Sequence, residues 1–217
     1  YVFNLSIENW QLPGLIRNPA KQVSLCKASP PRQVFLDANQ IKEILETSLA
    51  CPQNPHLPFI IAMLSLTGAR RTNVLEARWA DFNIKNKFWI IPMTKSGKPH
   101  TIPISDEVLA ILRHLPKKNE YLFPNPASGK PYVNIQKSWT AVRRKLGLNH
   151  VRLHDLRHSF ASLLINSGHS LYVVQQALGH HSPKVTQRYA HLSDEVLRRA
   201  NDSVGSQMQA GLASLLD

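Results

Sequence analysis

The sequence predicts a mainly helical fold that contains one small, three-stranded antiparallel β-sheet. Apolar residues recur at helical spacing over most of the 217 residues, whereas alternation with a period of two is confined to the stretch from Asp81 to Ile104. Turn-forming clusters at 85–87 and 95–98 divide this stretch into three short strands. With 43% hydrophobic residues, the chain can bury one sizeable core.

Several helices are expected before and after the sheet in the sequence. Asp37 and Gln40 form a capping box that begins the first of them. The nearly continuous apolar run 57–66 indicates a buried helix that ends at Gly68, and a short amphipathic helix follows it. After the sheet, helical periodicity is found at 105–115, 134–146, 154–167 and 171–178.

The two ends of the chain differ from this domain. Residues 1–33 contain scattered apolar positions, a turn signal and a basic stretch with little periodicity, which we interpret as the end of an upstream domain and a linker. The main domain is expected at 34–217, with a tail from about 193 whose segment 207–216 has apolar residues at helical spacing. The chain begins at Tyr1 rather than at methionine, which indicates a fragment of a longer protein.

The chain carries a large positive charge. Lys and Arg total 26 against 14 acidic residues, a formal net charge of +12. Such a charge attracts a polyanion such as nucleic acid, although a merely basic protein remains an alternative on this evidence alone. Cys26 and Cys51 have no metal-ligand or redox spacing, so reduced thiols in a cytoplasmic protein are expected. No apolar run approaches the roughly 18 residues of a membrane span, so no membrane partner is expected.

The stretch from Leu178 to His191 contains a candidate nucleophile. After one helix ends, Ser182 and Pro183 supply the N-cap and first position of a second short helix, which is expected to carry Tyr189 a short reach from His180. A tyrosine hydroxyl has an unperturbed pKa near 10, so at neutral pH it needs a base and a strongly electropositive site nearby.

Four residues elsewhere could supply these partners. His154 and Arg157 are three apart at the start of a helix, so they lie beside each other on one face. Arg70 is expected where a buried helix meets the N-terminus of the next, and Lys95 in the second turn of the sheet. Because a guanidinium offers paired donors to phosphate oxygens and stays charged, this set is suited to stabilising a pentacoordinate phosphorus.

Together these residues resemble the motifs of the tyrosine recombinases, the phage-type integrases, between about Val34 and Ser193. The matching positions are Thr67-Gly68-Ala69-Arg70, Lys95, His154-x-x-Arg157, Leu178-Gly179-His180, and Tyr189 nine residues beyond that histidine. The resemblance implies the catalytic-domain fold of that family, a DNA breaking-rejoining fold. It also implies that residues 1–33 are the remnant of the core-binding domain and its linker.

The resemblance further implies a role for each residue. Tyr189 would attack the scissile phosphate of double-stranded DNA and form a 3′-phosphotyrosine. His154 would handle the tyrosine proton, and Lys95 would protonate the 5′-oxygen leaving group. The phosphate would be bound and stabilised by Arg70, Arg157 and His180. The covalent intermediate conserves bond energy, so neither a metal ion nor another cofactor is required.

One position departs from the family pattern. The residue three beyond Arg70 is commonly acidic in the family, and here it is Asn73. An acidic side chain would orient Arg70 by a charge-assisted hydrogen bond, whereas an amide accepts only a neutral one, so we expect Arg70 to be held less firmly.

Metal binding is a rival interpretation of the histidines, since His154 and His158 are four apart on a predicted helix. A zinc-protease helix would need Glu directly after the first ligand, and Asp155 stands there instead. The sequence therefore favours phosphate chemistry over a metal site.

The function implied is site-specific DNA recombination, as in the integration and excision of a prophage or other mobile element. A type IB topoisomerase has a similar site, but the short spacing from His180 to Tyr189 favours the recombinase. A DNA-binding regulator that has lost the chemistry is the other alternative. The family implies a homotetramer on DNA, accessory proteins that bend the DNA, and a cytoplasmic, nucleoid-associated or phage-encoded protein. In that family the tail often docks on a neighbouring protomer.

Overall fold

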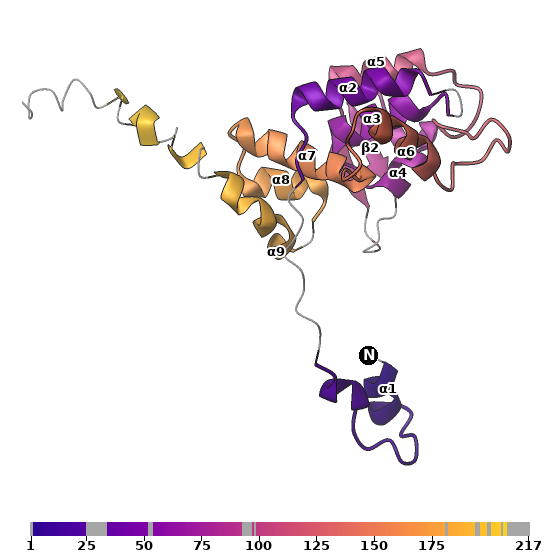
Figure 1. Ribbon diagram of the computed structural model, residues 1–217, viewed down its shortest axis with the longest axis vertical. Helices are drawn as coiled ribbons and strands as arrows, with labels where there is room; N and C mark the ends of the chain where they lie inside the picture. Colours follow the sequence, from indigo (N-terminus) through magenta and orange to yellow (C-terminus); the bar gives the residue numbers. More distant parts are fainter. Residues whose placement is uncertain are drawn as a thin grey trace, which may run out of the picture. The chain divides into compact units, whose positions relative to one another are not determined.

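The computed structural model describes residues 2–24, 34–51, 54–92, 97, 99–180, 182–193, 196–198, 201–204 and 206–207. Its contacts divide the chain into two compact units, residues 1–33 and residues 34–217 (Figure 1). Among the described helices, none is long and apolar enough to cross a membrane.

The first unit contains the helix α1 (Val2–Glu8) and the 3-10 helix η1 (Pro19–Gln22). The side chain of Asn18 caps η1 by accepting a hydrogen bond from the backbone of Ala20 at 2.9 Å. It also donates to Oδ1 of Asn4 at 2.6 Å and so ties η1 to α1. Most of the predicted basic linker, residues 25–33, lies outside the described residues.

The second unit is mainly helical, as the sequence predicts. The helices before its sheet are α2 (Ala38–Leu49), α3 (Leu57–Thr67), α4 (Arg71–Leu75) and the 3-10 helix η2 (Trp79–Asp81). Those after it are α5 (Asp106–His114), α6 (Gln136–Lys145), α7 (Leu153–Asn166), α8 (Leu171–Leu178), α9 (Pro183–Thr186) and the 3-10 helix η3 (Gln187–Ser193). The helices α5 to α8 lie within two residues of their predicted bounds.

Local sequence signals set the ends of α2 and α3. Oδ1 of Asp37 accepts from the backbone of Gln40 at 2.8 Å, and Oε1 of Gln40 accepts from the backbone of Asp37 at 3.1 Å, which confirms the capping box. α3 is buried along most of its length, because eight of its 11 residues are buried. It ends at Gly68, whose left-handed φ of +59° a glycine adopts without strain.

The sheet is the predicted antiparallel meander. Its strands are β1 (Phe82–Asn83), β2 (Phe88–Ile91) and β3 (His100–Pro103), in the order β1-β2-β3. The register pairs Phe88 with Pro103 and Ile91 with His100. The turn between β2 and β3 is only partly described, and Lys95 lies outside the described residues.

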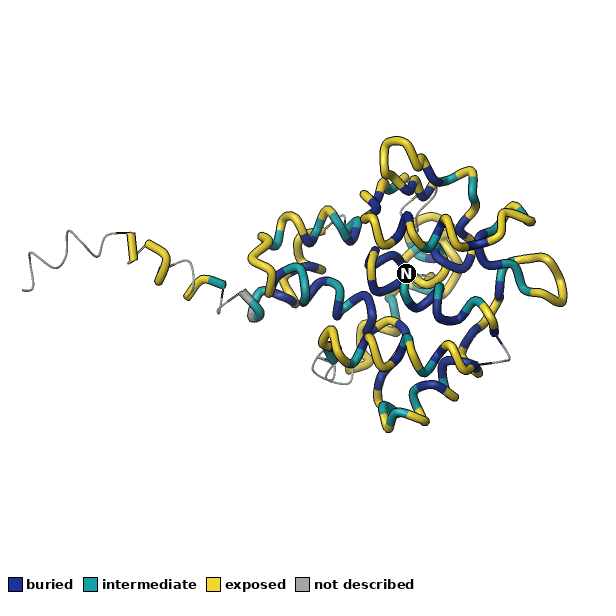
Figure 2. Tube along the Cα trace, turned by 90° about the horizontal axis from the view of Figure 1, so that it is seen from above, coloured by how far each residue is buried: buried dark blue, intermediate teal, exposed yellow. Residues whose placement is uncertain are grey.

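The second unit has two hydrophobic clusters, and the buried stretches of Figure 2 meet inside it. The larger cluster joins the helices α2, α3, α5 and α6 to the inner side of the sheet. The smaller one lies between α7, α8 and η3 and consists of Ala161, Ile165, Val174, Leu178 and Tyr189. α7 packs against α3 on one side and against α8 and η3 on another, so it joins the two clusters.

Two expectations about the C-terminal part have different outcomes. The apolar tail segment cannot be compared, because residues 208–217 lie outside the described residues. The second short helix is found, but it is shorter than expected: α9 ends at Thr186, and Tyr189 lies on η3. Thr186, the last residue of α9, and Tyr189 on η3 are each only 2% exposed.

Candidate active site

A pocket of about 370 Å³ lies where α7, the end of α8 and the segment α9–η3 meet. It brings together five of the six residues that the sequence predicts for the site, although they come from distant parts of the chain. Lys95, the sixth, lies outside the described residues. The pocket is lined by Arg70, His154, Arg157, His158, His180, Ser182, Val185, Arg188 and Tyr189.

Arg157 is held by the ends of two other helices. Nη1 donates to the carbonyl oxygen of Gly68 at 2.6 Å, and Nη2 donates to that of Leu178 at 2.7 Å. These carbonyls lie at the C-terminal ends of α3 and α8, where helix carbonyls lack intrahelical partners. The two bonds use two of the five N–H groups of the guanidinium and leave three for an anion. Burial, with a smaller effect of the Arg70 charge, lowers the pKa of Arg157 to about 10, so it stays charged at neutral pH.

Gly68 and Gly179 allow these helix ends to approach their neighbours. Both have left-handed backbones, with φ of +59° and +61°. A Cβ at Gly68 would lie 2.3 Å from Cδ1 of Phe160 on α7, and a Cβ at Gly179 would lie 2.9 Å from the ring of His100 on β3. The close approach at Gly68 brings its carbonyl within reach of Arg157. The one at Gly179 brings the end of β3 against the end of α8.

His180 directly follows the C-cap of α8, and its ring is oriented by Thr186. The distance between Nδ1 of His180 and Oγ1 of Thr186 is 2.9 Å. Burial, followed by the charge of Arg157, lowers the pKa of His180 to about 4, so the ring is neutral at pH 7. When Thr186 donates to Nδ1, the ring proton is on Nε2, which can then donate it to a phosphate oxygen.

The Tyr189 hydroxyl lies beside His158, one residue after Arg157 on α7. The distance from Oη of Tyr189 to Nδ1 of His158 is 2.5 Å. The ring of His154, one helical turn earlier, meets the ring of His158 edge-on, with centroids 4.8 Å apart. From the sequence, His158 was a candidate only for metal binding. Its spacing of four from His154 nevertheless indicated that both histidines lie on one face of the helix, because residues four apart share a helix face.

The hydroxyl of Tyr189 is protonated at neutral pH. Burial raises the pKa of Tyr189, and the charges of Arg157 and Arg188 offset part of this effect. Arg188 is a residue that sequence reasoning missed, although it directly precedes the candidate nucleophile. Its charge also contributes to the lowered pKa values of His154 and His158. The pocket is therefore strongly cationic even with its histidines neutral.

His154 stands at the boundary between this pocket and a second, basic one. Oδ2 of Asp155 accepts from the backbone of Arg152 at 2.8 Å, which places His154 in the first turn of α7. The second pocket, of about 550 Å³, shares Arg70 and His154 with the first. Its other lining residues are Arg71, Thr72, Gln136, Arg143, Arg152 and Leu153. We call the first the tyrosine pocket and the second the arginine trough.

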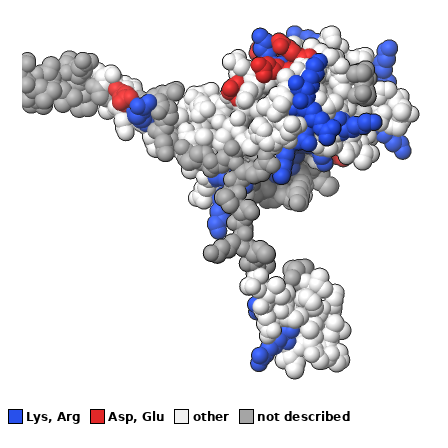
Figure 3. All heavy atoms as spheres, viewed as in Figure 1, with Lys and Arg blue, Asp and Glu red and all other residues white. Residues whose placement is uncertain are grey.

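The charge of the second unit is unevenly spread. Figure 3 shows Lys and Arg side chains gathered over α6, which ends in Arg143, Arg144 and Lys145, while acidic side chains gather towards α2. Because Arg143 also lines the arginine trough, the basic surface is joined to a pocket that shares Arg70 and His154 with the tyrosine pocket.

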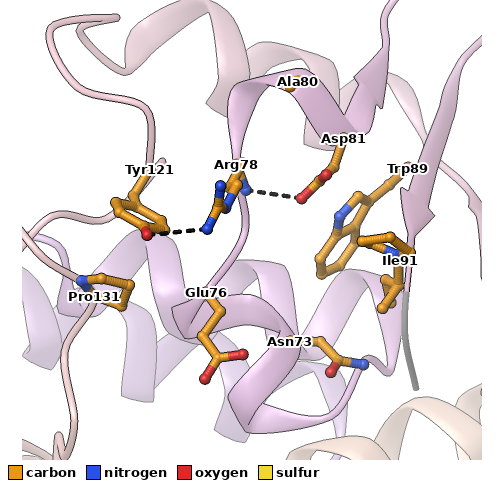
Figure 4. Close-up of a pocket in the computed structure, with 10 residues that line it drawn as sticks. Asn73, Glu76, Arg78, Ala80, Asp81, Trp89, Ile91, Tyr121 and Pro131 are labelled. Atoms are coloured by element: carbon orange, nitrogen blue, oxygen red, sulfur yellow. Dashed lines mark hydrogen bonds between the residues drawn. The ribbon is translucent and has the colours of Figure 1, made fainter. Parts of the chain in front are cut away.

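Asn73 is not among the residues that line the tyrosine pocket. It lines a different pocket beside β2, together with Glu76, Asp81 and Trp89, as Figure 4 shows. Within the described part of the chain, the structure shows no hydrogen bond between Asn73 and Arg70. The expectation that Arg70 is held less firmly by Asn73 than by an acidic residue stays a prediction, and the two side chains line different pockets. Among the described residues, no three His, Cys, Asp or Glu side chains form a possible metal site.

Comparison with known proteins shows the family of the chain. The phage integrase family matches residues 34–196. The tyrosine recombinase XerC of Xanthomonas campestris pv. campestris is 28% identical over 194 residues, which cover 86% of this chain and 60% of that protein. XerD of Rickettsia prowazekii is 31% identical over 209 residues, which cover 84% of this chain and 67% of that protein. The chain thus spans 60% of the length of its XerC relative.

Solved structures give the same result. The catalytic domain of bacteriophage HP1 integrase matches with a TM-score of 0.64 and 28% identity, covering 79% of this chain and 95% of that one. The site-specific recombinase XerH, in a pre-cleavage complex with its difH substrate, matches with a TM-score of 0.57 and 26% identity, covering 72% of this chain and 50% of that one. Because the family matches residues 34–196 and the XerD relative is 31% identical, the chain belongs to the phage integrase family of tyrosine recombinases.

Proposed function

We propose that this chain is the catalytic part of a site-specific DNA recombinase that works through a 3′-phosphotyrosine intermediate. The observation that carries the proposal is the tyrosine pocket, in which the hydroxyl of Tyr189 shares one cavity with the guanidinium groups of Arg70 and Arg157. Recombination also agrees with the relatives, which include an integrase of Salmonella phage P22 and the XerC and XerD recombinases.

The chemistry follows from the charges in this pocket. Oη of Tyr189 attacks the phosphorus, its O–H bond breaks, and the bond from phosphorus to the 5′-oxygen breaks in turn. Arg70, Arg157 and His180 stabilise the negative charge of the pentacoordinate phosphorus, because all three line the cavity that the Tyr189 hydroxyl shares. Arg157 suits this role because two helix ends already fix its plane, so little ordering is needed when the phosphate binds.

Protons have to leave the nucleophile and reach the leaving group. We assign the second task to Lys95, whose ammonium would protonate the departing 5′-oxygen. His154 lines the tyrosine pocket, and the family resemblance assigns the tyrosine proton to it. Religation is the same reaction in reverse, with a 5′-hydroxyl from another strand as the attacking group. No metal ion or other cofactor enters any of these steps.

The partner we propose is double-stranded DNA, bound along the arginine trough and α6. A homotetramer on paired sites, with accessory proteins that bend the DNA, would complete the reaction. Integration and excision of a prophage or another mobile element is the biological process that we propose.

Trapping of a covalent adduct tests the proposal. Full-length protein is incubated with a random-sequence pool of nicked duplexes, in which the strand end released by cleavage diffuses away and religation is prevented. A protein–DNA band on a denaturing gel is expected for the wild type and is expected to vanish in Tyr189→Phe. DNA binding should change little, because only one hydroxyl is lost. An equal band in the Tyr189→Phe variant would refute the assignment.

The same adduct identifies a cleaved sequence and separates the alternatives. Two duplexes with that sequence are mixed and products are scored for exchanged strands. Exchange is expected for a recombinase. A topoisomerase would relax supercoiled plasmid and reseal each duplex without exchange, and a regulator that has lost the chemistry would give no adduct.

A further inference from the structure

We propose that His158 is a catalytic residue: its Nδ1 holds the Tyr189 hydroxyl and takes up its proton as Oη attacks phosphorus. The proposal rests on the proposed function, because it concerns the same nucleophile. It differs from the role that the family resemblance implies, in which His154 handles the tyrosine proton.

The first support is contact with the reacting atom. Nδ1 of His158 lies 2.5 Å from Oη of Tyr189, and the two ring centroids are 5.8 Å apart. A general base needs this kind of direct hydrogen bond to the proton that it removes. Among the described ring contacts, His154 meets His158 and not Tyr189, so His154 is one step further from the nucleophile.

The second support is the fixed geometry of the pair. Tyr189 is only 2% exposed and belongs to the small cluster with Ala161 and Ile165 of α7, so its ring cannot swing freely. Phe35, which is far from Tyr189 in the sequence, packs on the same ring, with centroids 6.4 Å apart. Since α7 carries His158 and also packs against η3, the helix that aligns the base also holds the nucleophile.

The charge around His158 makes its proton uptake depend on the substrate. Burial, then the charges of His154 and Arg188, lowers the pKa of His158 to about 4, while Asp155 acts weakly in the opposite direction. A phosphate that enters the tyrosine pocket brings a negative charge among these cations, so it raises the pKa of His158. The base is therefore weak in the protein alone and stronger when the scissile phosphate is bound.

The pKa of His158 depends on all the titratable and charged groups that face it. They come from α7, from the residue after α8 and from η3: His154, Asp155, Arg157, His180, Arg188 and Tyr189.

The atoms balance over the cycle. During cleavage the O–H bond of Tyr189 breaks, the Oη–P bond forms, and the proton is bound to Nδ1 of His158 as an imidazolium. The bond from phosphorus to the 5′-oxygen breaks, and Lys95 supplies that oxygen with a proton. During religation the imidazolium returns its proton to Oη as the phosphotyrosine bond breaks.

The test compares two matched substitutions, His158→Asn and His154→Asn, on the same helix. Asparagine can place its side-chain oxygen near the position of Nδ1, so it accepts a hydrogen bond from Tyr189 but cannot take up a proton. The substrate is the duplex recovered from the random pool, made with a 5′-thio leaving group. This leaving group needs little protonation, so Lys95 contributes little and removal of the tyrosine proton limits the rate.

We expect His158→Asn to slow single-turnover cleavage by about 10²-fold or more and to abolish the fall in rate at low pH that the wild type shows. His154→Asn should keep that fall. The proposal is overturned if His158→Asn cleaves like the wild type, if it is slow with an unchanged pH profile, or if the profile is lost in His154→Asn instead. Failure of the wild type itself to form an adduct would count against the proposed function.

A spectroscopic measurement covers the case in which His158→Asn does not fold. In protein labelled with ¹⁵N in histidine, the Nδ1 resonance of His158 should shift between the wild type and Tyr189→Phe, because only the hydroxyl is removed. The Nδ1 resonance of exposed His169 is the control and should not move. An unchanged His158 resonance would mean that the hydrogen bond is absent in solution, and the proposal would then be wrong.

Discussion

Arg157 shows how one side chain can be both a structural element and a catalytic group. Its guanidinium satisfies carbonyls at the ends of α3 and α8, and the rest of its donors face the tyrosine pocket. Sequence spacing predicts that Arg157 lies beside His154, and both line that pocket. It cannot predict the two carbonyl partners, because Gly68 and Leu178 are distant in sequence and only tertiary packing brings them together.

Replacing this guanidinium by an ammonium should therefore destabilise the protein. Arg157→Lys keeps the charge but lacks the planar fork, so at least one of the buried carbonyls loses its partner. The free energy of unfolding, measured by urea denaturation, should fall by about 1–3 kcal/mol. Arg70→Lys is the matched control, because Arg70 lines the same pocket without a hydrogen bond in the described part of the chain. Equal losses in the two variants would contradict this account.

The nucleophile shows a second limit of sequence reasoning at this scale. The sequence places Tyr189 close to His180, and both line the tyrosine pocket. Its partner His158 is 31 residues away and was not predicted as such. Helical spacing shows that His158 and His154 share a face, but it does not show which segment packs on that face.

At the scale of elements, most of the helices and the meander were predictable because their signals are local. Capping residues, apolar periodicity and turn clusters act within a few residues, and the bounds of α5 to α8 reflect them. The segment after α8 was less predictable. A helix of four residues is too short for a periodic signal, so the change from α9 to η3 depends on packing of Thr186 and Tyr189 against α7 and α8.

The junction between α3 and α4 gives a prediction at this scale. Gly68→Ala should be destabilising for two reasons: its φ is +59°, and the new Cβ would lie 2.3 Å from the Phe160 ring. Gly147→Ala is the matched control, because its φ is +70° and nothing lies within 4 Å of the new Cβ. The control should cost about 1–2 kcal/mol for the left-handed backbone.

Gly68→Ala should cost a further amount of about 1–3 kcal/mol for overpacking. Addition of Phe160→Leu to Gly68→Ala should recover part of that extra loss, since it removes the ring that the Cβ meets. Thermal unfolding of the four proteins measures these differences. If Gly68→Ala and Gly147→Ala lose the same stability, the close packing of α3 on α7 is not the reason why position 68 requires glycine.

At the scale of the whole molecule, composition predicts the total charge but not its position. The net charge of +12 indicates a polyanionic partner, yet it cannot show that Arg71, Arg143 and Arg152 line one trough beside the tyrosine pocket. Arg143 is partly structural, since its Nη1 donates to the carbonyl oxygens of Asn149 and Val151 at 2.8 and 3.0 Å. Arg71 and Arg152 are exposed, and both line the arginine trough.

These two arginines should account for a defined part of the salt dependence of DNA binding. Each phosphate contact releases counterions, so the slope of log K against log salt concentration falls by about 0.9 for each contact that is lost. Arg71→Ala and Arg152→Ala should each reduce the slope by about that amount, on cleaved-sequence and random DNA alike, because phosphates carry no sequence information. Arg113→Ala, which removes the same charge from α5 outside the trough, should leave the slope unchanged. Fluorescence anisotropy from low to moderate salt measures all three. If Arg113→Ala changes the slope as much as Arg71→Ala does, DNA binding depends on the net charge of the protein, and the arginine trough is not the DNA-binding surface.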